Sequence, residues 1–195
     1  PQVDPTLIIQ TYSNLGEAYN NCKQYPHALA SFNKALNILR QHPENVYPQI
    51  VQTYNNIGVT YTHQSLFEKA ETIFRQALQI SIQELGEDRL VTGAVYNNLA
   101  NMKQQHGDYD QAITYFQKAL NIFRQHPDPK LENLPTTYTN LGVAHSLSGR
   151  YDAAINYFLQ TIMMYRKKMG SSHPLLAMNY INLGKAYRGK NDLKQ

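Results

Sequence analysis

The stretch TYNNIGVTY, residues 53–61, decides how the rest of the sequence is interpreted. Its apolar and aromatic residues recur at the three- and four-residue spacing of an α-helix, at Tyr54, Ile57, Gly58 and Tyr61. Asn55 and Asn56 interrupt this pattern. Asparagine is a mediocre helix former because its side chain competes for backbone hydrogen bonds. The two asparagines therefore need a role other than helix formation.

The same pattern returns every 42 residues along the chain. The related stretches are TYSNLGEAY (11–19), TYNNIGVTY (53–61), VYNNLANMK (95–103), TYTNLGVAH (137–145) and NYINLGKAY (179–187). An alanine and a phenylalanine four residues apart follow each of the first four stretches, as Ala28 with Phe32, Ala70 with Phe74, Ala112 with Phe116 and Ala154 with Phe158. Four full repeats and the first half of a fifth therefore cover essentially the whole chain.

Each repeat is predicted to form two helices. The first helix carries Tyr-x-x-Leu-Gly-x-x-Tyr, the second carries Ala-x-x-x-Phe, and a short break such as QQHGDYD (104–110) separates them. Pro26 fits the first turn of a second helix, where its missing N–H costs nothing. Asp4-Pro5 fits a cap followed by proline at the start of a first helix. The second helices are predicted to end near helix-stopping residues, at Pro43, Gly86, Pro127 and Gly170.

These motifs resemble the tetratricopeptide repeat family, whose pattern is an aromatic residue, Leu-Gly, Tyr and then Ala-x-x-x-Phe in a helix–turn–helix. The first repeat matches this pattern at Tyr12, Leu15, Gly16, Tyr19, Ala28, Phe32 and Ala35. The 42-residue period, with LGEDRL (85–90) and MGSSHPLLA (169–177) between helices, is similar to the kinesin light chain type of this repeat. The resemblance implies an all-α, right-handed superhelical solenoid of helix–turn–helix repeats.

The repeat pattern also predicts the domain organisation. We expect a single domain over residues 1–195, with repeats at about 5–46, 47–88, 89–130 and 131–172 and a half repeat at 173–195. We also expect this domain to be cut from a longer protein.

The composition limits the class of protein. Hydrophobic residues make up 42% of the chain, which is enough for a core and argues against disorder. No apolar run approaches the roughly 20 residues needed to span a bilayer, so we expect no membrane segment. The single cysteine, Cys22, excludes an internal disulfide framework and fits a reducing compartment, so we expect a cytoplasmic location.

No catalytic, cofactor or metal site is predicted. The seven histidines form no i,i+4 pair, and Cys22 has no cysteine nearby in the sequence. The sequence contains no phosphate loop, dinucleotide fingerprint or nucleophile motif. Nucleic-acid binding would require basic residues that recur in each repeat, and the basic residues gather at one end instead. We therefore expect a chain that is not an enzyme and binds no cofactor, and RNA binding is kept only as a minor alternative to protein binding.

One side of each first helix is predicted to be polar. At about 100° per residue, one sector of the second repeat, about 120° wide, holds Gln52, Asn55, Asn56, Val59, Thr62 and His63. The family resemblance implies that this sector, which we call the inner face, lines a concave groove. One asparagine of the inner face occurs in every repeat, two residues before the Gly or Ala. We call these five residues the asparagine ladder: Asn14, Asn56, Asn98, Asn140 and Asn182.

The asparagine ladder has two alternative roles. An amide offers both a donor and an acceptor, which suits the backbone of an extended peptide. The predicted peptide-binding residues are Asn14, Asn55, Asn56, Val59, His63, Asn97, Asn98, Asn101, Gln105, Asn140, Val143, Asn182, Lys185 and Arg188. Alternatively, the asparagines help adjoining repeats hold together. Both roles can hold at once.

The net charge of +4 is uneven. Residues 161–195 carry seven basic residues against Asp192, a net of +6, so the remaining residues carry −2. Lys185 and Arg188, together with the basic stretch at 166–168, could attract an acidic stretch of a partner. Alternatively, a helix following this end would neutralise the charge.

The pattern as a whole predicts a protein–protein interaction module that binds an extended peptide segment of a partner in its groove. The alternatives are a regulatory peptide sensor and a structural scaffold that associates with itself.

Overall fold

The computed structural model describes residues 4–42, 46–126, 133–169 and 174–192, and within these ranges the chain is helical with no strand. The α-helices are α1 (Pro5–Asn21), α2 (Tyr25–Gln41), α3 (Tyr47–His63), α4 (Phe67–Ile80), α5 (Leu90–Gln105), α6 (Tyr109–Gln125), α7 (Asn133–Leu147), α8 (Tyr151–Met169) and α9 (Pro174–Asp192). A short π-helical segment, η1 (Ser81–Leu85), extends α4. The prediction of an all-α chain with two helices in each full repeat is confirmed.

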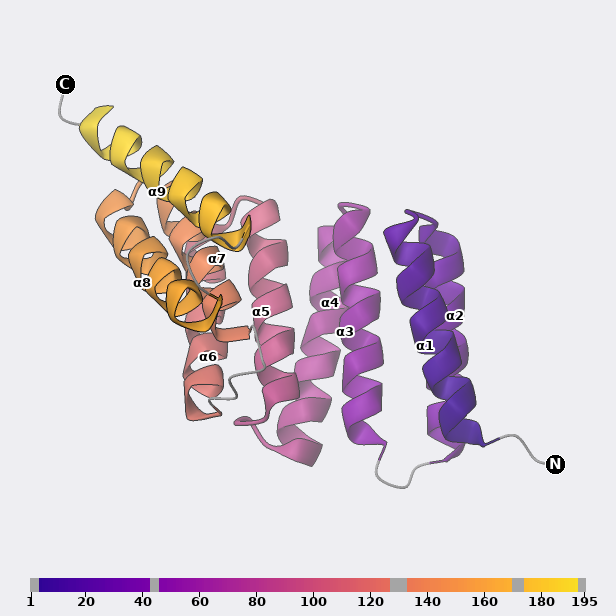
Figure 1. Ribbon diagram of the computed structural model, residues 1–195. Coiled ribbons are helices and arrows are strands. Elements are labelled where there is room, and N and C mark those ends of the chain that lie inside the picture. The colour runs from indigo at the N-terminus through magenta and orange to yellow at the C-terminus, as the bar shows by residue number, and fades with distance from the viewer. Residues whose placement is uncertain (1–3, 43–45, 127–132, 170–173, 193–195) are drawn as a thin grey trace. The chain divides into compact units, whose positions relative to one another are not determined.

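The chain divides into two compact units, residues 1–102 and residues 103–195, with the boundary inside α5. In the first unit α1 packs against α2, α3 packs against α4, and α2 packs against α3 (Figure 1). In the second unit α6 packs against α7, α7 against α8, and α8 against α9. In both units, helices that follow one another along the chain therefore pack together in these pairs.

The two helices of a hairpin approach closely where a glycine faces a phenylalanine. Phe32 and Phe74 are fully buried, and Phe158 is nearly so. A Cβ built on Gly16, Gly58 or Gly142 would lie 2.4, 2.6 or 2.6 Å from the Cε1 atom of the phenylalanine opposite. Because real Cβ atoms do not approach other atoms so closely, these contacts explain why Leu-Gly and Ala-x-x-x-Phe occur together in the sequence.

The helix ends follow the local sequence. Asp4 caps α1, where its Oδ1 accepts a hydrogen bond from the Thr6 N–H at 2.9 Å. Pro26 lies in the first turn of α2, as predicted. The break between the helices of each full repeat contains one residue with positive φ, and these recur every 42 residues at Lys23, Ser65, Gly107 and Gly149. Gly86 directly follows η1, as predicted, whereas Pro43, Pro127 and Gly170 lie outside the described residues.

Side-chain bonds fix one hairpin to the next within a unit. The Arg40 guanidinium donates to the Tyr54 hydroxyl at 2.8 Å, and 84 residues later Arg124 donates to the Tyr138 hydroxyl at 2.6 Å. In the second unit Lys190 also forms an ion pair with Asp152. These contacts join a second helix to the first helix that follows it, and so help set how adjacent first helices lie.

Candidate functional site

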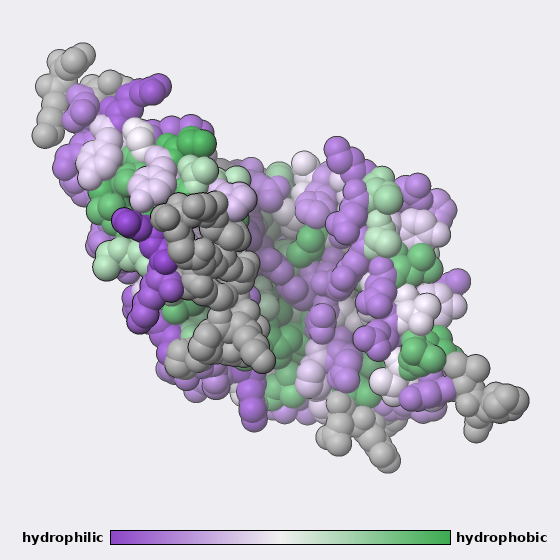
Figure 2. All heavy atoms as spheres, viewed as in Figure 1, coloured by the Kyte–Doolittle hydropathy of each residue, from purple (hydrophilic) through white to green (hydrophobic). Residues whose placement is uncertain are grey.

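In the first unit, the inner face is formed by α1, α3 and the part of α5 up to residue 102. Figure 2 shows mostly hydrophilic residues on the surface over α3. Among the predicted site residues here, Asn14 and His63 are exposed, and the half-buried ones are Asn56, Val59, Asn97, Asn98 and Asn101. The first unit therefore presents an amide-rich face that carries an acidic residue, the exposed Glu17 of α1.

Two asparagines of the ladder form hydrogen bonds between neighbouring first helices. The Asn56 Nδ2 donates to Glu17 Oε1 at 2.9 Å, which joins α3 to α1. The Asn98 Nδ2 donates to Asn55 Oδ1 at 3.1 Å, which joins α5 to α3. These bonds support the alternative in which the asparagines help adjoining repeats hold together. Each carboxamide has two N–H donors and an oxygen with two lone pairs, so one bond leaves capacity for a ligand.

Asn55 differs from its neighbour Asn56. It is 8% exposed and accepts the bond from Asn98, so it lies between two first helices. Asn56 is only half-buried. Of the two asparagines that interrupt the stretch 53–61, Asn56 is therefore the better placed to meet a partner.

In the second unit the inner face belongs to α7 and α9. Asn140, Val143 and Asn182 are half-buried, and Lys185 and Arg188 are exposed; Gln105, at the end of α5, is also exposed. The bond between the two first helices here comes from residues outside the ladder. The Thr139 hydroxyl lies 3.1 Å from Asn179 Oδ1, and Asn179 is 2% exposed.

Sequence reasoning missed Asn179 because it precedes the Tyr motif by one residue and lies outside the ladder. Three of the other four repeats have threonine at this position: Thr11, Thr53 and Thr137. A polar residue recurring beside the apolar side of the helix was the signal that could have identified it.

A buried histidine, His145, lies in the last helical turn of α7, just before the connection to α8. His145 is 8% exposed, and its ring stacks on Tyr157 with centroids 5.4 Å apart and an interplanar angle of 15°. Its Nδ1 is buried and has no hydrogen-bond partner among the described residues. Burial lowers the pKa of His145, and the nearby Arg150 guanidinium lowers it further. The fold therefore favours the neutral imidazole.

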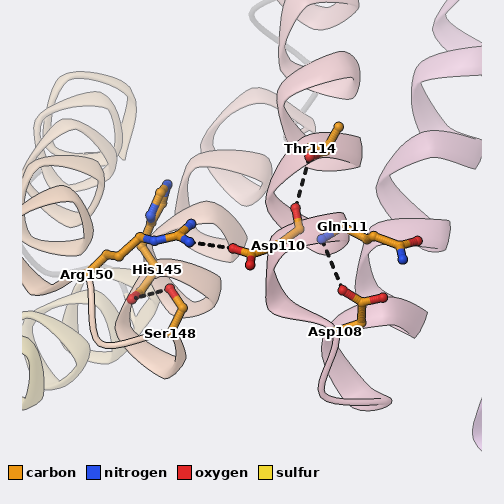
Figure 3. Close-up of polar contacts among 7 residues, drawn as sticks. All are labelled: Asp108, Asp110, Gln111, Thr114, His145, Ser148 and Arg150. Atoms are coloured by element: carbon orange, nitrogen blue, oxygen red, sulfur yellow. Dashed lines mark hydrogen bonds and ion pairs between the residues drawn. The ribbon is translucent and has the colours of Figure 1, made fainter.

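The backbone carbonyl of His145 accepts hydrogen bonds from residues of the turn that follows α7. Figure 3 shows that Ser148 donates to the His145 carbonyl and that Arg150 reaches across to Asp110 of α6. The Arg150 N–H also donates to the His145 carbonyl at 2.8 Å. These contacts join α6, α7 and α8 at this turn.

We expect the stability of the second unit to decrease as the pH falls below 6.5. Because the pKa of His145 is lowered in the folded state, the unfolded chain binds the proton first. The stability that the neutral His145 imidazole contributes is fully present above the ordinary pKa of histidine. It is lost as the pH falls from that value to the lower pKa of the folded chain, with a slope of at most about 1.4 kcal/mol per pH unit.

Denaturation of the chain and of His145→Tyr at several pH values measures the difference. Tyrosine occupies this position in other repeats, and exposed His42→Gln is the control. An equal pH dependence in all three chains would contradict the expectation.

Neither a metal site nor a membrane segment is found in the part of the chain that the structure describes. No three His, Cys, Asp or Glu side chains gather there as a ligand set, and Cys22 is exposed. None of the described helices is long and apolar enough to cross a membrane.

Comparison with known proteins gives one family and several similar folds. The sequence model of the tetratricopeptide repeat matches residues 7–83, 49–125, 91–167 and 133–195. No curated protein sequence matches the chain.

Among solved structures, BtubC (BKLC) from P. vanneervenii is 21% identical with a TM-score of 0.85, over 98% of this chain and 77% of that one. A putative kinesin light chain repeat protein from Podosopora anserina is 16% identical with a TM-score of 0.79, over 98% and 90%. A Rap protein complexed with competence and sporulation factor is 21% identical with a TM-score of 0.74, over 99% and 58%. At these identities the likeness concerns the fold.

Proposed function

Because the chain belongs to the tetratricopeptide repeat family, whose repeats generally mediate protein–protein interaction, we propose that it binds an extended segment of a partner protein along the inner face of its first helices. We further propose that residues 1–195 act as one binding domain, that this domain catalyses no reaction, and that it works in the cytoplasm. We also propose that the basic region at residues 161–195 favours a partner with an acidic stretch.

The observation that carries the proposal is the recurrence of one asparagine in all five repeats, on a helix side that the core does not need. Asn14 is exposed, and the other four are half-buried. An extended peptide presents backbone donors and acceptors at regular intervals, and amides can bond to both. Such contacts provide affinity for the main chain, while neighbouring side chains provide specificity.

The test selects short random peptides displayed on phage against the chain and measures their binding to a variant with Asn56, Asn98 and Asn140 replaced by alanine. We expect the selected peptides to bind the variant at least about tenfold more weakly, because each lost amide leaves peptide backbone groups unpaired. Far-UV circular dichroism checks that the variant remains helical.

Glu17→Ala is the matched control. It removes the partner of Asn56 within the chain while keeping the amide. If Asn56 binds the peptide, Glu17→Ala should weaken binding less than the single substitution Asn56→Ala, whereas an asparagine that acts only through its bond to Glu17 would make these two single variants equally weak. Retained binding by the triple variant would overturn the proposal.

The alternative of a scaffold that associates with itself is tested by the molecular mass in solution, measured over a range of concentrations. A mass that rises with concentration would favour the scaffold.

A further inference from the structure

The second helix of the fourth repeat, α8, differs from the other second helices on its exposed side. Leu159 is 41% exposed and Met163, four residues later, is 70% exposed. The other three full repeats have polar residues at these positions: Asn33, Arg75 and Gln117 align with Leu159, and Asn37, Gln79 and Asn121 align with Met163. All six of these residues are exposed as well. The exposure is therefore a property of the repeat position, whereas the apolar side chains are particular to α8.

Two cations continue the exposed side of α8. At about 100° per residue, Leu159, Met163, Arg166 and Lys167 fall within a sector about 100° wide. A different sector holds the buried residues of α8, which are Ala154, Ile155, Phe158, Thr161, Ile162 and Tyr165. That buried side packs against α7 and α9 (Figure 1). We call the four exposed residues, Leu159, Met163, Arg166 and Lys167, the outer strip.

The outer strip carries positive charge only. Arg166 and Lys167 are both exposed, and residues 156–167 contain no acidic residue. Asp152, in the first turn of α8, forms an ion pair with Lys190 of α9. Two copies of the outer strip would repel each other, whereas an acidic surface of another protein would be attracted to it. The charge therefore favours an acidic partner over a second copy of this chain.

The outer strip favours a helical partner over an extended one. The backbone N–H and C=O groups of an extended segment must find partners in the site that binds it. Leu159 offers no such group, and Met163 offers only a weak thioether acceptor. An α-helix bonds its own backbone internally, so it needs only apolar side chains three or four residues apart to pack on another helix. A membrane surface is not favoured, because interfacial helices insert a larger apolar face than two side chains.

We propose that the outer strip docks an amphipathic helix of a partner protein. Apolar residues of that helix pack on Leu159 and Met163, and acidic residues one turn further along meet Arg166 and Lys167. The spacing follows from α8, where the steps from Leu159 to Met163 and from Met163 to Lys167 are each roughly 6 Å along the helix. The outer strip belongs to a second helix, whereas the proposed peptide site belongs to the first helices. It is therefore a second binding surface, separate from the inner face.

The experiment selects binders of the whole chain from a phage library in which one exposed face of a stable helical hairpin is randomised. We expect enrichment of apolar residues three or four apart, with Asp or Glu one turn away. Leu159→Gln with Met163→Asn introduces the residues that α6 has at these positions, and it should weaken binding of the selected helices at least about tenfold. Arg166→Gln with Lys167→Gln should remove the acidic preference, and high salt should reduce it.

Each double variant has a matched control. Ile82→Arg controls for the apolar pair, because Ile82 is 41% exposed like Leu159 and arginine occupies its position in the other three full repeats. Lys185→Gln with Arg188→Gln controls for the cations, since these exposed residues lie on α9, outside the outer strip. Both controls should bind the selected helices as the unchanged chain does. Equal weakening by a control and by its outer-strip counterpart would contradict the proposal.

The variant with Asn56, Asn98 and Asn140 replaced by alanine separates the two sites. It should lose the extended peptides and still bind the selected helices, and loss of both would mean that the helices bind the inner face. If no helix is selected, the inference is wrong, while the proposed function stands on its own test. Sedimentation of the chain with phosphatidylserine vesicles, if it requires Leu159 and Met163, would assign the outer strip to a membrane surface and overturn the proposal.

Discussion

Phe32→Ala should destabilise the first repeat by about 3–5 kcal/mol, the usual cost of removing a buried phenylalanine. The Phe32 side chain is fully buried in a cluster of Ile9, Ala28, Ala35, Leu36, Leu39 and Ile57. The backbone of α1 at Gly16 lies directly against the ring, so the lost ring leaves a cavity between two helices. Because each repeat contacts only its neighbours, we expect the loss to concentrate at this end of the first unit. Chemical denaturation gives the loss of stability, and amide hydrogen exchange locates it in α1 and α2.

Leu7→Ala is the control for this substitution. Leu7 lies on the same helix as Gly16 but is 58% exposed, so its replacement should change stability by no more than about 0.5 kcal/mol. A loss below about 1 kcal/mol for Phe32→Ala would mean that the helices close over the cavity. An equal increase in exchange throughout the first unit would mean that its repeats unfold together rather than from one end.

The pairing of Phe32 with Gly16 shows why the sequence predicts so much of this fold. Both residues belong to motifs that recur every 42 residues, and a contact repeated in several copies is far easier to recognise than one copy alone. The helix caps at Asp4 and Pro26 are equally local, since they depend only on a few adjacent residues. The helices, their order and their packing sides could therefore be predicted without a structure.

The π-helical segment η1 could not be predicted in this way. The Ser81 carbonyl accepts from the Gly86 N–H at 3.0 Å, and the Ser81 hydroxyl lies 2.6 Å from that of Thr92 in α5. The wider turn brings a buried serine to a threonine of the next helix. Such a hydrogen bond depends on how two helices meet, and the sequence of neither helix reveals it.

The same limit applies to the candidate site. Helical geometry places Asn55 and Asn56 on one sector, yet Asn55 is buried against Asn98, whereas Asn56 is half-buried and bonds to Glu17. The angle around one helix says which residues point away from its own hairpin. It does not say how closely the next first helix approaches, and that distance decides which amides remain available to a partner.

Gly142→Leu should destabilise the second unit by about 3 kcal/mol or more, because overpacking forces buried groups apart. A Cβ at this position would already lie 2.6 Å from Cε1 of Phe158, which is 1% exposed and has little room to move. Leucine adds three more carbon atoms at the same place. Gly142→Ala should cost less, since alanine is the natural residue at position 100 of the same motif. Thermal and chemical denaturation of the two variants measure the difference.

Gly184→Leu is the matched control for Gly142→Leu, because both glycines occupy the same position of the repeat motif. A Cβ on Gly184 would meet no atom within 4 Å, and the residue is exposed on α9. There leucine should stabilise the helix by about 0.5–1 kcal/mol, since glycine is the poorer helix former. The two substitutions should therefore change stability in opposite directions. If both destabilised the chain equally, the glycine would be required by the backbone of the first helix itself, and close approach of the second helix would not be the reason for its recurrence.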